Sequence, residues 1–235
     1  MKTKADLIIQ EAKKNAALEA IKHVKNKSII GLGSGTTVAF AIEALGERVK
    51  NEKLKIMGIP SSYQAFQLAV QHGIQITTLD EYPIIDVTID GADQITPELY
   101  LIKGMGAALL REKIVATASK YNIIIADESK RVNRLGENNQ FVPIEVLPFA
   151  LTLVKNKIIK IGGTATIREG KGKLGPIITD NGNIIIDANF GVIQNPQELS
   201  MKVKMIPGVV ETGLFTNLTN IAYIATENEI EKIQK

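Results

Sequence analysis

The stretch Ser28-Ile-Ile-Gly-Leu-Gly-Ser-Gly-Thr-Thr37 decides the fold class of this chain. It begins with a short apolar run, Ser28 to Gly31, and a helical pattern of apolar residues follows it over Val38 to Arg48. Glycines between a strand and a helix allow a tight turn and bring backbone N–H groups close to a ligand, and the N-terminus of a helix favours anions. The stretch therefore predicts a strand, a loop suited to anions, and a helix.

The hydroxyl side chains of this loop favour phosphate as the anion. Ser34, Thr36 and Thr37, on either side of Gly35, offer hydroxyl donors to phosphate oxygens. The loop is not a Walker A motif, because no Gly-Lys-Ser/Thr follows, and it fits a dinucleotide fingerprint poorly, because a Thr stands at the third Gly position. We expect phosphate or another anion here, the alternative being a plain strand-to-helix turn capped by hydroxyls.

Strands and helices alternate on both sides of this stretch, which indicates a Rossmann-like parallel sheet with helices on both faces. The expected helices are Ala5 to Val24, a segment that ends at about Gln71 after a capping box of Ser61 and Gln64, and Ala107 to Lys120. The further expected strands are Leu54 to Ile59, Ile84 to Ile89 and Asn122 to Ala126.

The pattern changes after about Lys130. Asn181-Gly182 predicts a tight hairpin, and a helix is expected over Pro196 to Met205. We therefore expect a small α+β domain at 131–205, inserted into a Rossmann-like domain of 1–130 and 206–235. Strand-like runs near Val209 and at Ile221 to Ala225, followed by a short polar helix, are expected to close the chain.

Composition excludes several kinds of chemistry. The 235 residues include no Cys and two His, with a formal net charge of +3. Without thiols there is no disulfide, Cys nucleophile, Fe–S cluster or Cys-based zinc site, and isolated His23 and His72 leave little for a metal. There is no block of five like charges and no apolar run long enough to span a membrane. We expect a cytoplasmic protein that binds neither nucleic acid nor membrane, and whose acid–base chemistry uses carboxylates, lysines or hydroxyls.

Asp90-Gly91-Ala92-Asp93 follows the apolar run Ile84 to Ile89. Two carboxylates across a Gly turn, at the carboxyl end of a strand, occupy a position where α/β enzymes contact ligands. The alternative, an Asx turn capped by Asp, is common. The motif by itself leaves the two interpretations open.

Lys103-Gly104-Met105-Gly106 opens the predicted helix that carries Glu112. The neighbours of Glu112 on that helix face are small or apolar, and such surroundings tend to raise the pKa of a carboxyl toward the range of a general base. The alternative is a solvated glutamate beside Arg111 and Lys113. Lys130 follows the next strand and adds a cation at the same edge of the sheet, unless it belongs to a charged surface turn.

Together these motifs closely resemble the ribose-5-phosphate isomerase A family, and the similarity covers nearly the whole chain. Later segments fit as well, including Pro143-Ile-Glu-Val, Thr179-Asp-Asn-Gly-Asn183 and Pro207-Gly-Val-Val-Glu-Thr-Gly-Leu-Phe215. The resemblance implies interconversion of D-ribose 5-phosphate and D-ribulose 5-phosphate in the non-oxidative pentose phosphate pathway. It also implies a homodimer or homotetramer and no metal or organic cofactor.

By this resemblance, Glu112 is the proton acceptor. From the chemistry of the reaction we expect Asp90 or Asp93 to handle a hydroxyl proton and Lys103 to stabilise charge on oxygen. The substrate-binding residues that it implies are Ser34, Gly35, Thr36, Thr37, Gly91, Ala92, Gly104, Met105, Gly106 and Lys130. Two departures are visible, since the family usually has Glu at the position of Gln94 and Gly at that of Met105. They concern affinity and selectivity more than reaction type.

Two other functional classes are alternatives. Related α/β domains sense sugar phosphates in transcriptional regulators, but this chain lacks room for a helix-turn-helix module before the first strand. CoA transferases use a Glu as nucleophile, but their motifs are not matched here. An assay of ribose 5-phosphate conversion with and without a chelator separates the three.

Overall fold

The structure is a computed structural model that describes residues 3–172 and 174–234. The described residues divide into two compact units. The first unit comprises the chain up to Ala92, Arg111–Arg131 and the chain from Leu218 onward, and the second comprises Asp93–Leu110 and Val132–Asn217. Within the described ranges, no helix is both long and apolar enough to cross a membrane.

The first unit contains a mixed sheet with the strand order β14-β13-β7-β4-β1-β2-β3. Neighbouring strands are parallel except β13 and β14, so the predicted Rossmann-like fold is confirmed. Its strands are β1 (Ile29–Leu32), β2 (Met57–Pro60), β3 (Gln75–Ile76), β4 (Val87–Gly91), β7 (Asn122–Asp127), β13 (Ile221–Ala225) and β14 (Ile230–Gln234).

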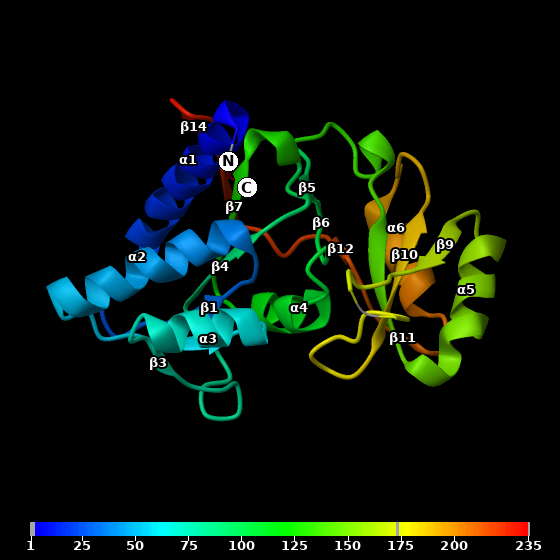
Figure 1. The fold of residues 1–235 in the computed structure, drawn as a ribbon, viewed down its shortest axis with the longest axis horizontal. Helices are drawn as coiled ribbons and strands as arrows, with labels where there is room; N and C mark the ends of the chain where they lie inside the picture. The colour runs from blue at the N-terminus through cyan, green and yellow to red at the C-terminus, as the bar shows by residue number, and fades with distance from the viewer. Residues whose placement is uncertain (1–2, 173, 235) are drawn as a thin grey trace. The chain divides into compact units, whose positions relative to one another are not determined.

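Helices cover both faces of this sheet. They are α1 (Lys4–Ala20), η1 (Ile21–His23), α2 (Thr36–Glu52), α3 (Tyr63–Gln71), α4 (Leu109–Thr117) and η2 (Glu128–Lys130). Because side chains alternate along a strand, Ile30 packs into a core with α1, α2 and α3, whereas its neighbour Ile29 packs into a cluster with Val115 of α4. Figure 1 shows α1 and α2 as neighbouring blue ribbons.

The expected polar helix at the C-terminus is wrong. Residues Ile230–Gln234 form β14, which pairs antiparallel with β13 from Ala225↔Ile230 to Ile221↔Gln234. Its burial pattern is almost wholly exposed, so the segment lacks the apolar alternation that marks a half-buried strand. Residues Ile230–Gln234 become an edge strand because their backbone pairs with that of the apolar strand β13. The local sequence does not reveal this pairing.

The second unit combines antiparallel strands with helices, as expected for an α+β fold. One sheet has the order β11-β8-β10-β9 and another has the order β12-β6-β5. The elements are β5 (Gln94–Ile95), β6 (Leu101–Ile102), η3 (Glu137–Asn139), β8 (Val142–Val146), η4 (Pro148–Ala150), α5 (Leu151–Lys160), β9 (Thr164–Ile167), β10 (Ile184–Asn189), α6 (Pro196–Lys204), β11 (Val209–Thr212) and β12 (Leu214–Phe215). In Figure 1, α5 lies beside β9, and α6 is the orange helix that packs on β11.

Two segments belong to a different compact unit from the domain to which the sequence assigned them. Residues 93–110 and 206–217, assigned from the sequence to the Rossmann-like part, cluster with the second unit. The physical reason is strand pairing, since β12 pairs with β6, and β11 pairs with β8. Both segments are short, and their pairing partners lie far away in the sequence.

Candidate active site

The loop between β1 and α2 has the conformation that its glycines predict. Gly35 caps α2 with φ of 101°, which an L side chain rarely adopts. A Cβ on Gly33 would lie 2.1 Å from Oδ1 of Asp90, so only glycine allows this close approach. The backbone N–H of Ser34 donates to that same Oδ1 at 3.2 Å. The loop and Asp90 therefore form one local structure in the first unit.

The turn after β2 supports this loop. The Ser34 hydroxyl lies 2.9 Å from Oγ of Ser61 and 2.7 Å from Oγ of Ser62, and the N–H of Gly35 donates to Oε1 of Gln64 at 2.9 Å. The predicted capping box of Ser61 and Gln64 is wrong, because Ser62 is the N-cap of α3 and the Gln64 side chain bonds Gly35. Ser61 still donates its N–H to the carbonyl of Leu32 in strand-like fashion, so Ser62 becomes the cap of α3, accepting from Ala65. The Gln64 side chain therefore bonds the loop at Gly35 and does not cap its own helix.

Lys13 lies beside this loop, although nothing in the sequence pointed to it. Its Nζ donates to Oγ1 of Thr36 at 3.1 Å, which places a cation beside the first turn of α2. The residue stands 23 positions upstream in α1, within an ordinary amphipathic pattern, and no local signal separates it from Lys14. Only the packing of α1 along α2 brings it to the loop. Thr37 lies next to Thr36 in the same turn.

Asp90 lies near the carboxyl end of β4, between β1 and β7 in the sheet. Its side chain is buried, and Oδ1 also accepts the N–H of Gly91 at 2.8 Å. Gly91 and Ala92 follow and are half-buried. Lys130, half-buried in η2, comes directly after the neighbouring parallel strand β7. Because carboxyl ends of parallel strands share one sheet edge, Lys130 lies at the edge that holds Asp90 and the loop.

Glu112 lies in the first turn of α4 and is only 5% exposed. Its neighbours on the helix face, Leu109 and Val115, are also buried, which confirms the predicted apolar surroundings. The alternative of a solvated surface glutamate is wrong. Since α4 leads through a short turn into the start of β7, its N-terminal turn lies toward the carboxyl edge of the sheet.

Residues Lys103-Gly104-Met105-Gly106, here called the Lys103 loop, belong to the second unit. Lys103 is 3% exposed, its N–H donates to the carbonyl of Gly213 at 2.9 Å, and its ammonium lies 5.5 Å from the centre of the Phe215 ring. Gly104 has φ of 105°. The N–H of Met105 donates to Oδ2 of Asp93 at 3.0 Å, so the second aspartate and this loop are joined.

The two departures from the family pattern have distinct environments. Gln94 is buried, its Oε1 accepts the N–H of Gly136 at 2.8 Å, and its Nε2 donates to the carbonyl of Glu137 at 2.8 Å. Met105 is 45% exposed, and its sulfur lies 3.8 Å from Nη2 of Arg168. Gly106 carries no close neighbour at the position of a Cβ. Gln94 is thus a structural residue of the second unit, whereas Met105 lies partly at the surface.

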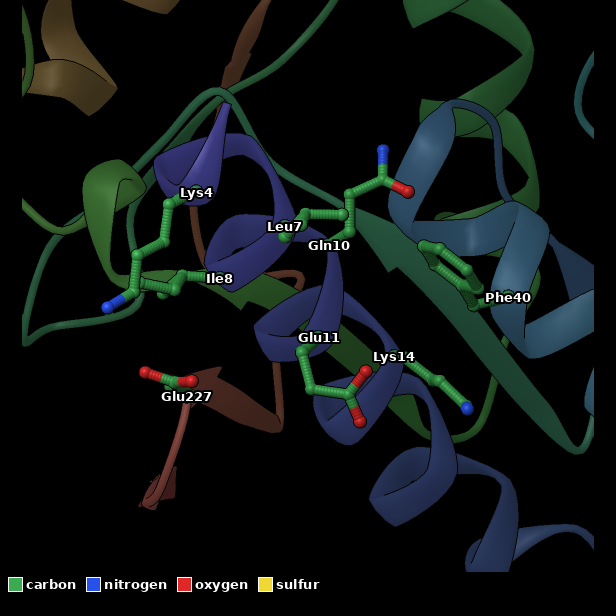
Figure 2. A pocket seen from close by; sticks show the side chains of 8 residues that line it. All are labelled: Lys4, Leu7, Ile8, Gln10, Glu11, Lys14, Phe40 and Glu227. Atoms are coloured by element: carbon green, nitrogen blue, oxygen red, sulfur yellow. The ribbon is translucent and has the colours of Figure 1, made fainter. Parts of the chain in front are cut away.

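A separate hollow of about 500 Å³ occurs in the first unit. Figure 2 shows its lining, which comes mainly from α1, with Phe40 of α2 and Glu227. None of the predicted site residues lines it. Among residues 3–172 and 174–234, no group of three or more His, Cys, Asp or Glu is arranged to hold a metal ion.

Comparison with known proteins gives consistent results. Residues 57–229 match the family described as ribose 5-phosphate isomerase A (phosphoriboisomerase A). The ribose-5-phosphate isomerase A of Methanosarcina acetivorans is 46% identical over 94% of this chain and 93% of its own length. The human ribose-5-phosphate isomerase is 43% identical over 93% of this chain and 71% of its own.

Solved structures agree with these relatives. The structure of ribose 5-phosphate isomerase A from Methanocaldococcus jannaschii superposes with a TM-score of 0.92 at 42% identity, covering 96% of this chain and 99% of that one. A D-ribose-5-phosphate isomerase solved in complex with phospho-erythronic acid gives a TM-score of 0.94 at 42% identity, covering 97% and 99%. The likeness therefore extends over the full length of both solved chains.

Proposed function

The chain belongs to the ribose-5-phosphate isomerase A family, and from this premise we propose that it interconverts D-ribose 5-phosphate and D-ribulose 5-phosphate through a cis-enediolate, with Glu112 as the base. The observation that carries the proposal is the burial of Glu112 in the first turn of α4. A carboxylate among apolar groups is a stronger base than one in water. The chain is an isomerase, which excludes the sensor and transferase alternatives.

The proton transfers balance with one base. In the open-chain aldehyde, Glu112 removes the proton on C2, the electron pair forms the C1–C2 double bond, and O1 takes up negative charge. The proton of the 2-hydroxyl passes to O1, and Glu112 returns its proton to C1 while C2 becomes the ketone. Lys103 stabilises the charge on the oxygens, an electrostatic role that is favoured for a buried cation.

Ribose 5-phosphate exists mostly as a ring, so the ring must open first. We assign this step to Asp90 or Asp93, whose carboxylate takes the proton of the 1-hydroxyl as the bond between C1 and the ring oxygen breaks, and then gives that proton to the ring oxygen. Asp90 accepts backbone N–H groups from Ser34 and Gly91, and Asp93 accepts one from Met105. Such bonds orient a carboxylate. The residues Gly91, Ala92, Gly104 and Gly106 let the backbone approach the sugar.

The phosphate group is assigned to the first turn of α2. Ser34, Gly35, Thr36 and Thr37 precede or open this 17-residue helix, whose N-terminus favours anions. Lys13 adds positive charge beside Thr36, and Lys130 adds more at the same sheet edge. Binding energy from a remote phosphate positions C1 and C2 for proton transfer.

A phospho-erythronic acid complex of a relative supports the chemistry. This acyclic sugar acid carries a phosphate at one end and, at the other, a planar carboxylate that resembles an enediolate. We expect it to inhibit this protein competitively against ribose 5-phosphate. We also propose that the protein works in the non-oxidative pentose phosphate pathway, in the cytoplasm, as a homodimer or homotetramer, which light scattering and cell fractionation test.

The decisive experiment is turnover of ribose 5-phosphate by purified protein and by Glu112→Gln, which keeps the shape and removes the base. Loss of a general base is expected to cost about 10²-fold or more in kcat. In D2O, deuterium should appear at C1 of the ribulose 5-phosphate in those turnovers in which the proton held by Glu112 exchanges with solvent, and excess chelator should leave turnover unchanged. Near-normal turnover of the variant would contradict the role of Glu112.

A further inference from the structure

Arg168 is a buried cation that no part of the proposed mechanism uses. It follows directly after β9 and is 9% exposed. Its Nε donates to Oδ2 of Asp187 on β10 at 2.8 Å, and its Nη2 donates to Oδ1 of the same carboxylate. The pair is therefore bidentate, the geometry in which a guanidinium is most firmly oriented. Asp187 balances the charge of Arg168.

The third nitrogen of Arg168 reaches the Lys103 loop. Nη1 donates to the carbonyl oxygen of Gly104 at 2.8 Å and to that of Met105 at 2.9 Å. These are consecutive peptide groups, immediately after Lys103. All three nitrogens of the guanidinium thus donate to protein atoms, so the side chain acts on the loop and not as a direct ligand of a phosphate.

The peptide group between Gly104 and Met105 is held at both ends. Its oxygen accepts from Arg168, and its N–H donates to Asp93. Because a trans peptide is planar, two such bonds fix the direction of the whole group. The positive φ of Gly104 is needed for this path, and the N–H of Ala107 closes the turn on the carbonyl of Gly104 at 3.0 Å.

The backbone of Lys103 is attached to the same framework. Its N–H donates to Gly213, whose own N–H donates to the carbonyl of Pro143 at 2.7 Å. Pro143 is the register partner of Asp187 between β8 and β10. The ion pair and the backbone of Lys103 are therefore connected through Gly213 and β8. Displacement of either carbonyl contact changes the direction in which the chain leaves Lys103.

We propose that Arg168, oriented by Asp187, is a positioning residue that sets the conformation of the Lys103-Gly104-Met105-Gly106 loop and through it the placement of Lys103 and Asp93. The inference rests on the proposed function, in which these two residues act on the substrate. A buried ion pair is a weak means of stabilising a fold, since apolar residues of similar volume often stabilise equally well. Contacts to two consecutive loop carbonyls give this pair a role that apolar residues cannot supply.

The test is steady-state kinetics of Arg168→Met beside Arg134→Met, an exposed arginine of the same unit that bonds Gln194. Misplacement of a charge-stabilising group by about 1 Å can cost about 10²-fold, so we expect kcat to fall by that order in Arg168→Met. KM should change little, because phosphate binding is assigned to the first unit. Arg134→Met should leave kcat and KM unchanged, and Arg168→Lys should have a higher kcat than Arg168→Met.

Two double variants separate positioning from stability. R168M/D187L removes both charges of the ion pair and should fold with a melting temperature near that of the wild type, yet keep the low kcat. In K103M/R168M the loss of kcat should be clearly smaller than the product of the two single losses, because Arg168 acts in part through Lys103. Full recovery of kcat in R168M/D187L, or simple additivity in K103M/R168M, would overturn the inference.

Amide hydrogen exchange gives a readout that does not depend on turnover. Protection of the Met105 and Ala107 amides should fall in Arg168→Met and in R168M/D187L, and stay unchanged in Arg134→Met. Unchanged protection in R168M/D187L would overturn the inference even if the isomerase assay succeeds. An inactive wild-type protein would refute the proposed function, and loss of protection would then still support the loop-positioning role.

Discussion

The backbone N–H of Met105 donates a hydrogen bond of 3.0 Å to Oδ2 of Asp93. This contact ties one of the two aspartates of Asp90-Gly-Ala-Asp93 to the loop that carries Lys103. An asparagine at position 93 keeps an acceptor oxygen for the Met105 N–H but loses the ability to take a proton. Asp93→Asn therefore separates the proposed acid–base role of the carboxylate from its hydrogen bond to the loop.

Asp93→Asn should slow turnover unequally in the two directions if Asp93 opens the ring. Ribulose 5-phosphate cannot close to a five-membered ring because its 5-oxygen carries the phosphate, so reaction from the ketose needs no ring opening. We expect a loss of about 10²-fold from ribose 5-phosphate and a clearly smaller loss from ribulose 5-phosphate. If Asp90→Asn shows this asymmetry and Asp93→Asn does not, ring opening belongs to Asp90.

Lys13→Met should raise KM for ribose 5-phosphate with little change in kcat. A hydrogen bond to a charged group contributes about 1.5–3 kcal/mol, so the expected increase in KM is about 10-fold to 100-fold. The matched control is Lys14→Met, which removes the same charge from an exposed neighbour in α1. Equal effects of the two substitutions would point to general electrostatic attraction and not to a contact beside Thr36.

Gln94→Glu, a change toward the usual family residue, should destabilise this protein. The Gln94 amide both accepts from Gly136 and donates to the carbonyl of Glu137, and a carboxylate cannot donate that second bond. Leaving a buried acceptor unpaired costs about 1–3 kcal/mol. Urea unfolding measures the loss, and Gln94→Met, which removes both bonds, is the comparison. Unchanged stability of Gln94→Glu would show that the carbonyl of Glu137 finds another donor.

His23 should make stability depend on pH near neutrality. Its Nε2 lies 2.7 Å from the Tyr223 hydroxyl, and partial burial, then the charge of Lys232, lower the pKa of His23 below its ordinary 6.5, although Glu19 acts in the opposite direction. Protonation therefore favours the unfolded chain. Stability should be complete above pH 6.5 and fall as the pH drops from 6.5 toward the lowered pKa.

Thermal melts of the wild type and His23→Gln between pH 7.5 and 5 check this sign. Glutamine retains a polar partner for Tyr223 but does not titrate, so the variant should lose less stability over this range. A parallel decline in both proteins would assign the pH dependence to other groups. The residue was interpreted from the sequence as a solvated helix side chain, and its half-buried stacking on Tyr121 at 5.8 Å between ring centres was not foreseen.

Much of the first unit could be predicted because its signals are local. The run Ser28 to Gly31, the loop glycines and the apolar face after Val38 each need only their own neighbours to be recognised, and they became β1, the cap of α2 and the helix itself. The buried state of Glu112 was also predicted, since residues three and four positions away on a helix share its face.

The contacts that assemble the site depend on tertiary structure. Lys13 reaches Thr36 only because α1 packs along α2, and Arg168 reaches Gly104 only because β9, β10 and the loop belong to one unit. The polar segment after Glu229 became an edge strand because β13 offered its backbone. By itself the sequence determined which chemical groups are present and which local elements carry them. The tertiary structure decided which distant groups meet, because a hydrogen bond requires a distance and a direction that separation along the chain does not specify.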